Sequence, residues 1–168
     1  MPDRISNFVR VIGSPDVLKC FRMVALGETG KFSYQNLYPI PNDIKCECET
    51  REKWCYDHWG NKWGAYGDID FYDENLSNYY LDIYYCTARS TSVPFWSYVT
   101  SQYPVRVINY FHSDGIDFCG KHTFELGYLI QRLLYSDFEN DSNYFLKYAQ
   151  KCGCDHYYDN LERSDSDD

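Results

Sequence analysis

The chain has 168 residues, which favours a single domain that buries roughly two thirds of the surface of its unfolded form. Its 25 acidic and 16 basic residues give a formal net charge of −9, so the overall field repels phosphate and disfavours direct binding to nucleic acid. No apolar run approaches the length of about 20 residues that a membrane-spanning helix requires, and the first residues lack a hydrophobic signal core, so we expect a cytoplasmic protein.

The N-terminal residues predict a strand followed by a helix. Residues 5–12 mix apolar and polar side chains in the manner of a first strand. Ser14 then offers an N-cap, and Pro15 suits the first helical position. The apolar face that follows ends at Gly27, a residue typical of helix stops, so the helix prediction rests on a complete set of local signals.

The next region contains prolines and then tryptophans. Residues 32–41 include Pro39 and Pro41, which lack amide donors, so we expect an edge segment or a loop there. Residues 51–58 predict a short helix. It leads into the turn at residues 59–64, which reads WGNKWG.

Two strands and a second helix are expected after this turn. Residues 68–72 and 80–85 alternate apolar with polar side chains, a period of two that indicates half-buried strands joined by a hairpin loop. Ser92 is the expected N-cap of the second helix, which ends before Pro104. Further strands are predicted from Val105 onward and at residues 122–127.

The order strand, helix, paired strands, helix, strand is typical of the split βαβ arrangement of a ferredoxin-like sandwich. This is an α+β fold whose antiparallel sheet has helices on one face. We expect one such domain over residues 1–160, with a C-terminal extension from about residue 128 that contains a helix capped by Asp141 or Ser142. Residues 161–168 are expected to form an acidic, disordered tail.

Several short motifs also carry a family resemblance over roughly residues 5 to 127. The most specific is the Trp-Gly-x-Lys-Trp element at residues 59–63. The others are Ser6-Asn7-Phe8, Pro39-Ile40-Pro41, Thr87 to Pro94 with the Tyr103-Pro104 boundary, and Gly115 to Gly120. Together they resemble the YubB-type ferredoxin-like family of bacteriophages, prophages and conjugative plasmids. The resemblance implies a compact domain without iron in a bacterial host cell, and it implies an accessory function against host defence. It supplies no catalytic residues.

The chain has 18 tyrosines, too many for a core alone, and exposed tyrosine suits contact with a partner. Period two puts acids and tyrosines of the paired strands on the sheet face opposite the aliphatic side chains. The expected partner-binding residues are Asp68, Asp70, Tyr72, Asp73, Glu74, Tyr80, Asp82 and Tyr84.

An acidic surface of this kind imitates the phosphates of nucleic acid. The leading hypothesis is therefore a non-enzymatic protein that binds and inhibits a host nucleic-acid-handling defence protein or ribonucleoprotein complex, for example as an anti-CRISPR protein. A plainly solvated sheet face is the alternative reading of the same residues. A second function, binding of single-stranded nucleic acid through sheet-face aromatics, requires more basic residues than Arg89, Arg106 and Lys121 provide.

Other candidate sites are weaker. Acid–base chemistry would draw on His58, His112, His122, Asp114 or Asp117, but no known catalytic motif surrounds them, so we expect no enzyme. The paired cysteines are separated by one residue where structural zinc sites have two to four, so we expect no metal and no cofactor. Whether Cys46, Cys48, Cys55, Cys152 and Cys154 bind metal or stay as free thiols is left open, as is the oligomeric state.

The tryptophan turn is expected to be architectural. Trp59 and Trp63 could clamp a partner, but large aromatic side chains usually bury most of their area, so we expect them to close one end of the core. In this reading Gly60 permits the turn and Lys62 is solvated.

Overall fold

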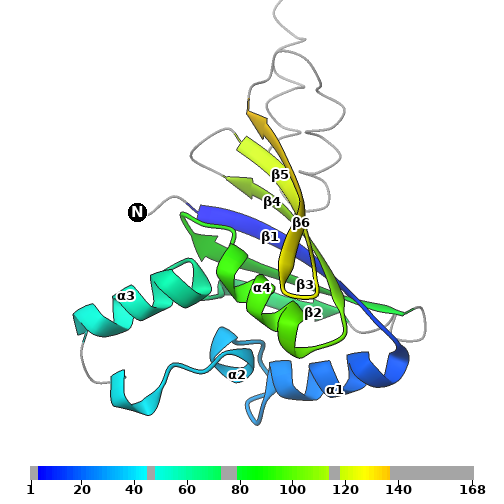
Figure 1. The fold of residues 1–168 in the computed structure, drawn as a ribbon, viewed down its shortest axis with the longest axis horizontal. Coiled ribbons are helices and arrows are strands. Elements are labelled where there is room, and N and C mark those ends of the chain that lie inside the picture. Colours follow the sequence, from blue (N-terminus) through cyan, green and yellow to red (C-terminus); the bar gives the residue numbers. More distant parts are fainter. Residues whose placement is uncertain (1–3, 45–47, 73–78, 114–117, 137–168) are drawn as a thin grey trace, which may run out of the picture.

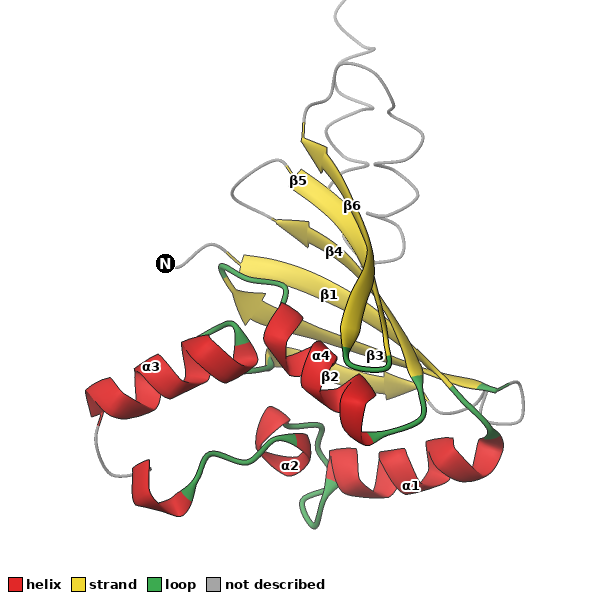
Figure 2. Ribbon diagram, in the orientation of Figure 1, coloured by secondary structure: helices red, strands yellow, loops and turns green. Residues whose placement is uncertain are grey.

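The computed structural model describes residues 4–44, 48–72, 79–113 and 118–136. These residues form an α+β fold with one six-stranded antiparallel sheet, and Figures 1 and 2 show the helices on one side of that sheet. The strand order is β2-β3-β1-β4-β5-β6, so β1 lies between β3 and β4. The α+β class with an antiparallel sheet is therefore as expected.

The elements have the following bounds. The strands are β1 (Arg4–Ile12), β2 (Tyr66–Tyr72), β3 (Tyr80–Ala88), β4 (Arg106–Ser113), β5 (Phe118–Glu125) and β6 (Tyr128–Ser136). The helices are α1 (Pro15–Leu26), α2 (Tyr34–Leu37), α3 (Cys48–Trp59) and α4 (Val93–Gln102), with a 3-10 turn, η1, at Asn42–Ile44. None of the described helices has both the length and the apolar character that a bilayer crossing requires.

Helix α1 begins and ends where its local signals predict. The Ser14 hydroxyl accepts a hydrogen bond from the Val17 amide at 3.4 Å, and Pro15 occupies the first turn. Gly27 has a φ of 53° and donates its amide to the carbonyls of the preceding turn, which ends the helix. Its buried face consists of Leu18, Phe21 and Ala25.

The stretch at residues 32–41 contains a short helix that the sequence reading missed. Ser33 caps α2 by accepting a hydrogen bond from the Gln35 amide at 3.2 Å. The two prolines lie after this helix and do exclude an interior strand, as expected. The stretch nevertheless packs inward, because Phe32, Tyr34, Leu37 and Ile40 are all buried.

An aromatic core fills the space between the sheet and the helices. Tyr85 of β3 is fully buried, and its hydroxyl accepts hydrogen bonds from Trp96 Nε1 at 2.8 Å and from the Tyr34 hydroxyl at 3.0 Å. Phe95 stacks on Tyr34 with ring centroids 3.6 Å apart. Burial raises the pKa of both tyrosines above the ordinary value. Much of the aromatic content of the chain is thus core, with its polar tips satisfied internally.

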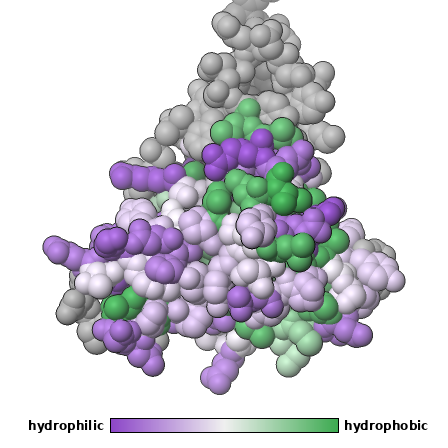
Figure 3. All heavy atoms as spheres, viewed as in Figure 1, coloured by the Kyte–Doolittle hydropathy of each residue, from purple (hydrophilic) through white to green (hydrophobic). Residues whose placement is uncertain are grey.

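The C-terminal side of the sheet differs from the sequence reading. The final strand expected at residues 122–127 is the second half of β5 and its turn, and the expected extension from residue 128 begins with a further strand, β6. Leu126 and Gly127 both have positive φ, as a two-residue hairpin turn requires. Apolar side chains gather over this edge of the sheet in Figure 3, and Ile130 and Leu134 are more than half exposed there. The helix expected from Asp141 and the tail at residues 161–168 lie outside the described residues.

Candidate functional site

Most of the predicted partner-binding residues lie on adjoining parts of β2 and β3. Their register pairs Asp70 with Tyr84 and Tyr72 with Asp82, so these four side chains share the face that the helices leave open. The period of two places Tyr80 on the same face of β3. The structure therefore brings these predicted residues together, as the alternation in the sequence indicated.

The remaining predicted residues lie at or beyond the end of this surface. Asp68 is exposed and falls where the pairing of β2 with β3 is irregular, next to Gly67, whose φ is 83°. Asp73 and Glu74 lie outside the described residues.

Asp82 is not part of an exposed acidic patch, which corrects the expectation. Its carboxylate accepts two hydrogen bonds from Arg10 of β1, at 2.8 and 2.7 Å, and Asp82 is only 6% exposed. The same guanidinium lies 4.0 Å from the ring centroid of Tyr80. The hydrogen bond to Asp82 raises the pKa of Arg10. Alternation within one hairpin gave the correct face for Asp82, but the neutralising cation comes from a strand far away in sequence.

The negative charge that stays accessible lies on the edge strand. Asp68 and Asp70 are exposed, and Tyr72 is 47% exposed, with its hydroxyl donating to Asp70 Oδ2 at 3.3 Å. We call Asp68, Asp70 and Tyr72 the β2 edge surface. It is smaller than the predicted acidic surface, and it adjoins the paired charges of Arg10 and Asp82.

A row of half-buried aromatic side chains crosses the open face beside it. Tyr84, Phe8 and Tyr110 are register partners on β3, β1 and β4. Lys121 on β5 is the next partner, with its Nζ 5.9 Å from the ring centroid of Tyr110. Tyr84, Phe8 and Tyr110 are called the aromatic row below, and Arg10 lies one register row away from it. This face combines rings with cations, which the scattered sequence positions did not indicate.

The two tryptophans of the WGNKWG turn have different roles. Trp59 is 4% exposed and donates its indole Nε1–H to the Tyr38 carbonyl at 3.0 Å, so its expected place in the core is confirmed. Trp63 is 51% exposed, so the expectation that it also closes the core is wrong. Lys62, which we expect to be solvated, is paired with Glu52 at 2.5 Å, and 35% of its side chain stays exposed.

Asn61 fixes the turn to the loop before α4. Its side-chain amide donates to the Ser92 hydroxyl at 2.5 Å, and its carbonyl oxygen accepts from the Gly64 amide at 2.5 Å. A Cβ on Gly60, where φ is 79°, would lie 2.9 Å from Pro94 Cδ. Ser92 takes the N-cap position of α4 as predicted, but with φ at 59° its side chain bonds Asn61 and makes no cap hydrogen bond. The WGNKWG turn therefore joins two loops, and its second tryptophan remains at the surface.

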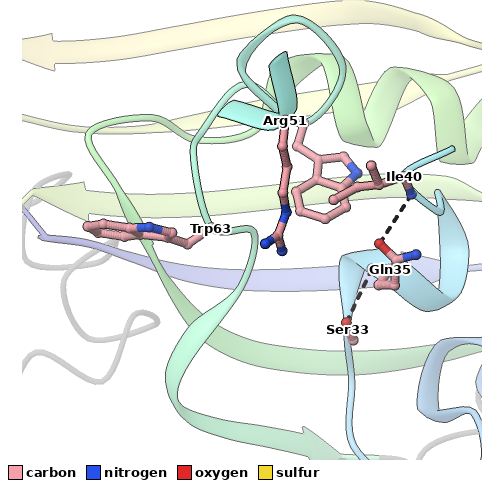
Figure 4. A pocket seen from close by; sticks show the side chains of 6 residues that line it. Ser33, Gln35, Ile40, Arg51 and Trp63 are labelled. Atoms are coloured by element: carbon pink, nitrogen blue, oxygen red, sulfur yellow. Dashed lines mark hydrogen bonds between the residues drawn. The ribbon is translucent and has the colours of Figure 1, made fainter. Parts of the chain in front are cut away.

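A cleft with a volume of about 480 Å³ opens beside this turn (Figure 4). Its lining residues are Ser33, Gln35, Ile40, Arg51, Trp59 and Trp63, and we call it the Arg51 cleft. In Figure 4 the Arg51 side chain from α3 lies between Trp63 on one side and Ile40 and Gln35 on the other. A second hollow of about 170 Å³ shares Arg51 and Trp63 and is completed by Glu52 and Lys62. No motif in the sequence indicates a role for Arg51.

The histidines proposed for acid–base chemistry do not meet. His122 on β5 is 3% exposed, with its Nδ1 3.2 Å from the Thr91 hydroxyl, and burial lowers its pKa to about 4. His122 pairs with Asn109 of β4 and so shares its face of the sheet. His112 is three residues further along β4, so it lies on the opposite face. His58 stacks on Trp54 at 4.3 Å, on α3. Asp114 and Asp117 lie outside the described residues.

The described part of the chain holds no group of three or more metal-ligating side chains. Cys55 is a buried free thiol whose pKa is raised by burial. Cys46, Cys152 and Cys154 fall outside the described residues, and the side chain of Cys48 is not described. The expectation that the chain holds no metal therefore stays a prediction.

Comparison with known proteins gives one fold-level likeness. No family model and no curated protein matches the chain. Among solved structures, it is similar to a protein api92 from Yersinia pseudotuberculosis, of the family DUF1281, with a TM-score of 0.50 and 11% sequence identity. The similarity covers 64% of this chain and 40% of that chain. At such identity the likeness shows the fold alone.

Proposed function

We propose that this chain is a non-enzymatic phage or plasmid protein that binds and inhibits a host nucleic-acid-handling defence complex. The β2 edge surface would enter a basic groove of that complex in place of nucleic acid. The observation that carries the proposal is the pairing of exposed carboxylates with an exposed ring. Asp68 and Asp70 form no ion pair with a described residue, and Tyr72 beside them is 47% exposed.

Charge and position both support this surface. The net charge of −9 favours encounter with a basic partner through complementary potential. Tyrosine next to carboxylate suits a protein interface better than carboxylate alone. The alternative role of Asp68 and Asp70 is to protect the outer edge of β2 from pairing with another chain, a common use of charge on edge strands.

We also infer a ferredoxin-like unit in the first four strands, consistent with the YubB-type resemblance. The order β2-β3-β1-β4 supports this, with α1 connecting β1 toward β2 and α4 connecting β3 to β4. In this reading the β5–β6 hairpin is an addition at the β4 edge of the sheet.

The experiment that tests the function uses tagged protein as bait in lysates of candidate bacterial hosts, with mass spectrometry of the captured proteins. We expect a nucleic-acid-handling complex, and a CRISPR effector is the first to assay. The variant Asp68→Lys/Asp70→Lys should abolish capture, whereas Glu28→Lys/Asp43→Lys, an equal charge change at exposed positions of other elements, should retain it. Equal capture by both variants would refute the β2 edge surface as the interface.

The aromatic row supports a second candidate, a domain that binds single-stranded nucleic acid. Tyr84, Phe8 and Tyr110 lie side by side on the open sheet face, with Lys121 nearby, while the charge of Arg10 is already paired with Asp82. Bases stack on aromatic rings in related arrangements. A mobility shift with single-stranded oligonucleotides at low salt decides this: a shift that is lost in Tyr84→Ala/Tyr110→Ala supports it, and no shift excludes it.

A further inference from the structure

The Arg51 cleft offers hydrogen-bond donors that the protein itself leaves unused. Arg51 is exposed and has no ion-pair or hydrogen-bond partner among the described residues. The Gln35 side-chain oxygen accepts from the Ile40 amide at 3.1 Å, which leaves its NH2 group free. The Ser33 hydroxyl oxygen accepts from the Gln35 amide at 3.2 Å. Among the described residues, no acceptor takes the Ser33 hydroxyl hydrogen.

These three groups define the chemistry of a ligand. A guanidinium, an amide NH2 and a hydroxyl hydrogen all donate, so the cleft fits a group with several acceptor oxygens and a negative charge. A phosphate has three terminal oxygens for three separate donors, whereas a carboxylate has two. Phosphate is the better match, and guanidinium geometry suits it.

The two charged residues that directly follow Arg51 on α3 already have partners. Glu52 pairs with Lys62 at 2.5 Å, and on the same helix Lys53 pairs with Asp57 at 2.8 Å. Both described pairs are neutral as units, so Arg51 is an unpaired positive spot among the described residues of a chain of net charge −9. Such a spot attracts an anion at short range even though the distant field opposes it, because salt screens the distant charges more strongly.

The cleft also has an exposed ring beside the cation. Trp63 is 51% exposed and meets Tyr66 edge-on, at 6.2 Å and 85°. Trp59 and Ile40 supply buried apolar surface at the same site. The volume of about 480 Å³ lies in the range of small-molecule sites. A planar ring carried by the anion has a stacking partner here.

We propose that the Arg51 cleft binds a nucleoside monophosphate. Arg51, Gln35 and Ser33 hold the phosphate, and Trp63 stacks on the base. This site lies on α2, α3 and the tryptophan turn, so it goes beyond the function proposed for the β2 edge surface. It also gives the exposed Trp63 a role that core packing does not provide.

The test is calorimetric titration of the full chain with adenosine 5′-monophosphate, adenosine and inorganic phosphate. We expect saturable one-to-one binding of the monophosphate, with adenosine and inorganic phosphate each at least about tenfold weaker, because each forfeits one of the two contacts. No binding of the monophosphate up to about 10 mM would overturn the proposal, because a site with a Kd of about 1 mM would be about nine tenths occupied there. N-acetyl-tyrosine carries an aromatic ring and a carboxylate in place of a phosphate. If it bound more tightly than the monophosphate, the assigned ligand class would be wrong.

Variants locate the site. Arg51→Gln should weaken the monophosphate about tenfold, the effect of losing one charge-assisted hydrogen bond. Trp63→Ala should weaken the monophosphate and leave inorganic phosphate unchanged. The control Lys19→Gln removes one exposed positive charge from α1 and should change neither. Equal affinity in all variants would refute this cleft as the site. The variant Asp68→Lys/Asp70→Lys should bind the monophosphate like the wild type, so this test is separate from the test of the proposed function.

Discussion

Tyr85 and Tyr72 belong to neighbouring strands of one hairpin and lie on opposite faces of the sheet. Tyr85, on the helix-covered face, is fully buried, and its hydroxyl accepts from Trp96 and Tyr34. Tyr72, on the open face, is 47% exposed and its hydroxyl donates to Asp70 at 3.3 Å. The same residue type holds the core on one face and is available to a partner on the other. Substitutions on the covered face should therefore lower stability, whereas substitutions on the open face should affect binding.

The largest expected effect is on the covered face. Trp96→Ala removes a fully buried ring and the indole donor to Tyr85, and should lower the free energy of unfolding by about 3–5 kcal/mol. Tyr72→Ala removes an aromatic ring from the open face and should lower the free energy of unfolding by at most about 0.5 kcal/mol. Urea unfolding of both variants measures this difference. Similar losses in the two would contradict the division of the sheet into a structural and an available face.

A smaller effect is expected where the tryptophan turn contacts the loop before α4. Gly60→Ala combines a φ of 79° with a Cβ 2.9 Å from Pro94 Cδ, and should cost about 2–3 kcal/mol. Gly30→Ala has a similar φ of 68° but no atom within 4 Å, so only the backbone term of about 1 kcal/mol remains. Thermal unfolding compares the pair. If Gly30→Ala cost as much as Gly60→Ala, the turn would not be docked as described.

A pH dependence is also expected from the covered face. Burial lowers the pKa of His122 from 6.5 to about 4 in the folded chain, so the unfolded chain binds a proton first as the pH falls. Stability should therefore decline between about pH 6.5 and pH 4. His122→Gln should flatten that part of the profile. A profile with the same slope in His122→Gln would show that other groups set it.

Local signals allowed much of the fold to be predicted. Ser14, Pro15 and Gly27 define α1 because caps act on the residues next to them. Period two gave the faces of β2 and β3 correctly. The strand β6 was missed because residues 128–136 do not alternate, and Leu126-Gly127 is a weak turn signal. Each success rests on neighbours in sequence, and β6 is held by its pairing with β5.

The candidate site was harder to predict, because distant residues decide which groups are accessible. Asp82 was placed on the correct face, but Arg10, 72 positions away, neutralises it across the β1–β3 register. Trp59 and Trp63 look equivalent in the sequence, yet only the first packs into the core. Arg51 carries no motif, and it becomes a candidate only when α2 and α3 come together around it. Local alternation predicts a face, and only long-range pairing reveals what remains available on it.

The most direct test of the account is displacement of nucleic acid from the captured host complex. Purified complex with labelled nucleic acid in its groove is titrated with the wild type and with Asp68→Lys/Asp70→Lys. The account predicts release of the nucleic acid by the wild type and none by the charge-reversal variant. Release by both, or a stable complex that holds the wild type and the nucleic acid together, would contradict it.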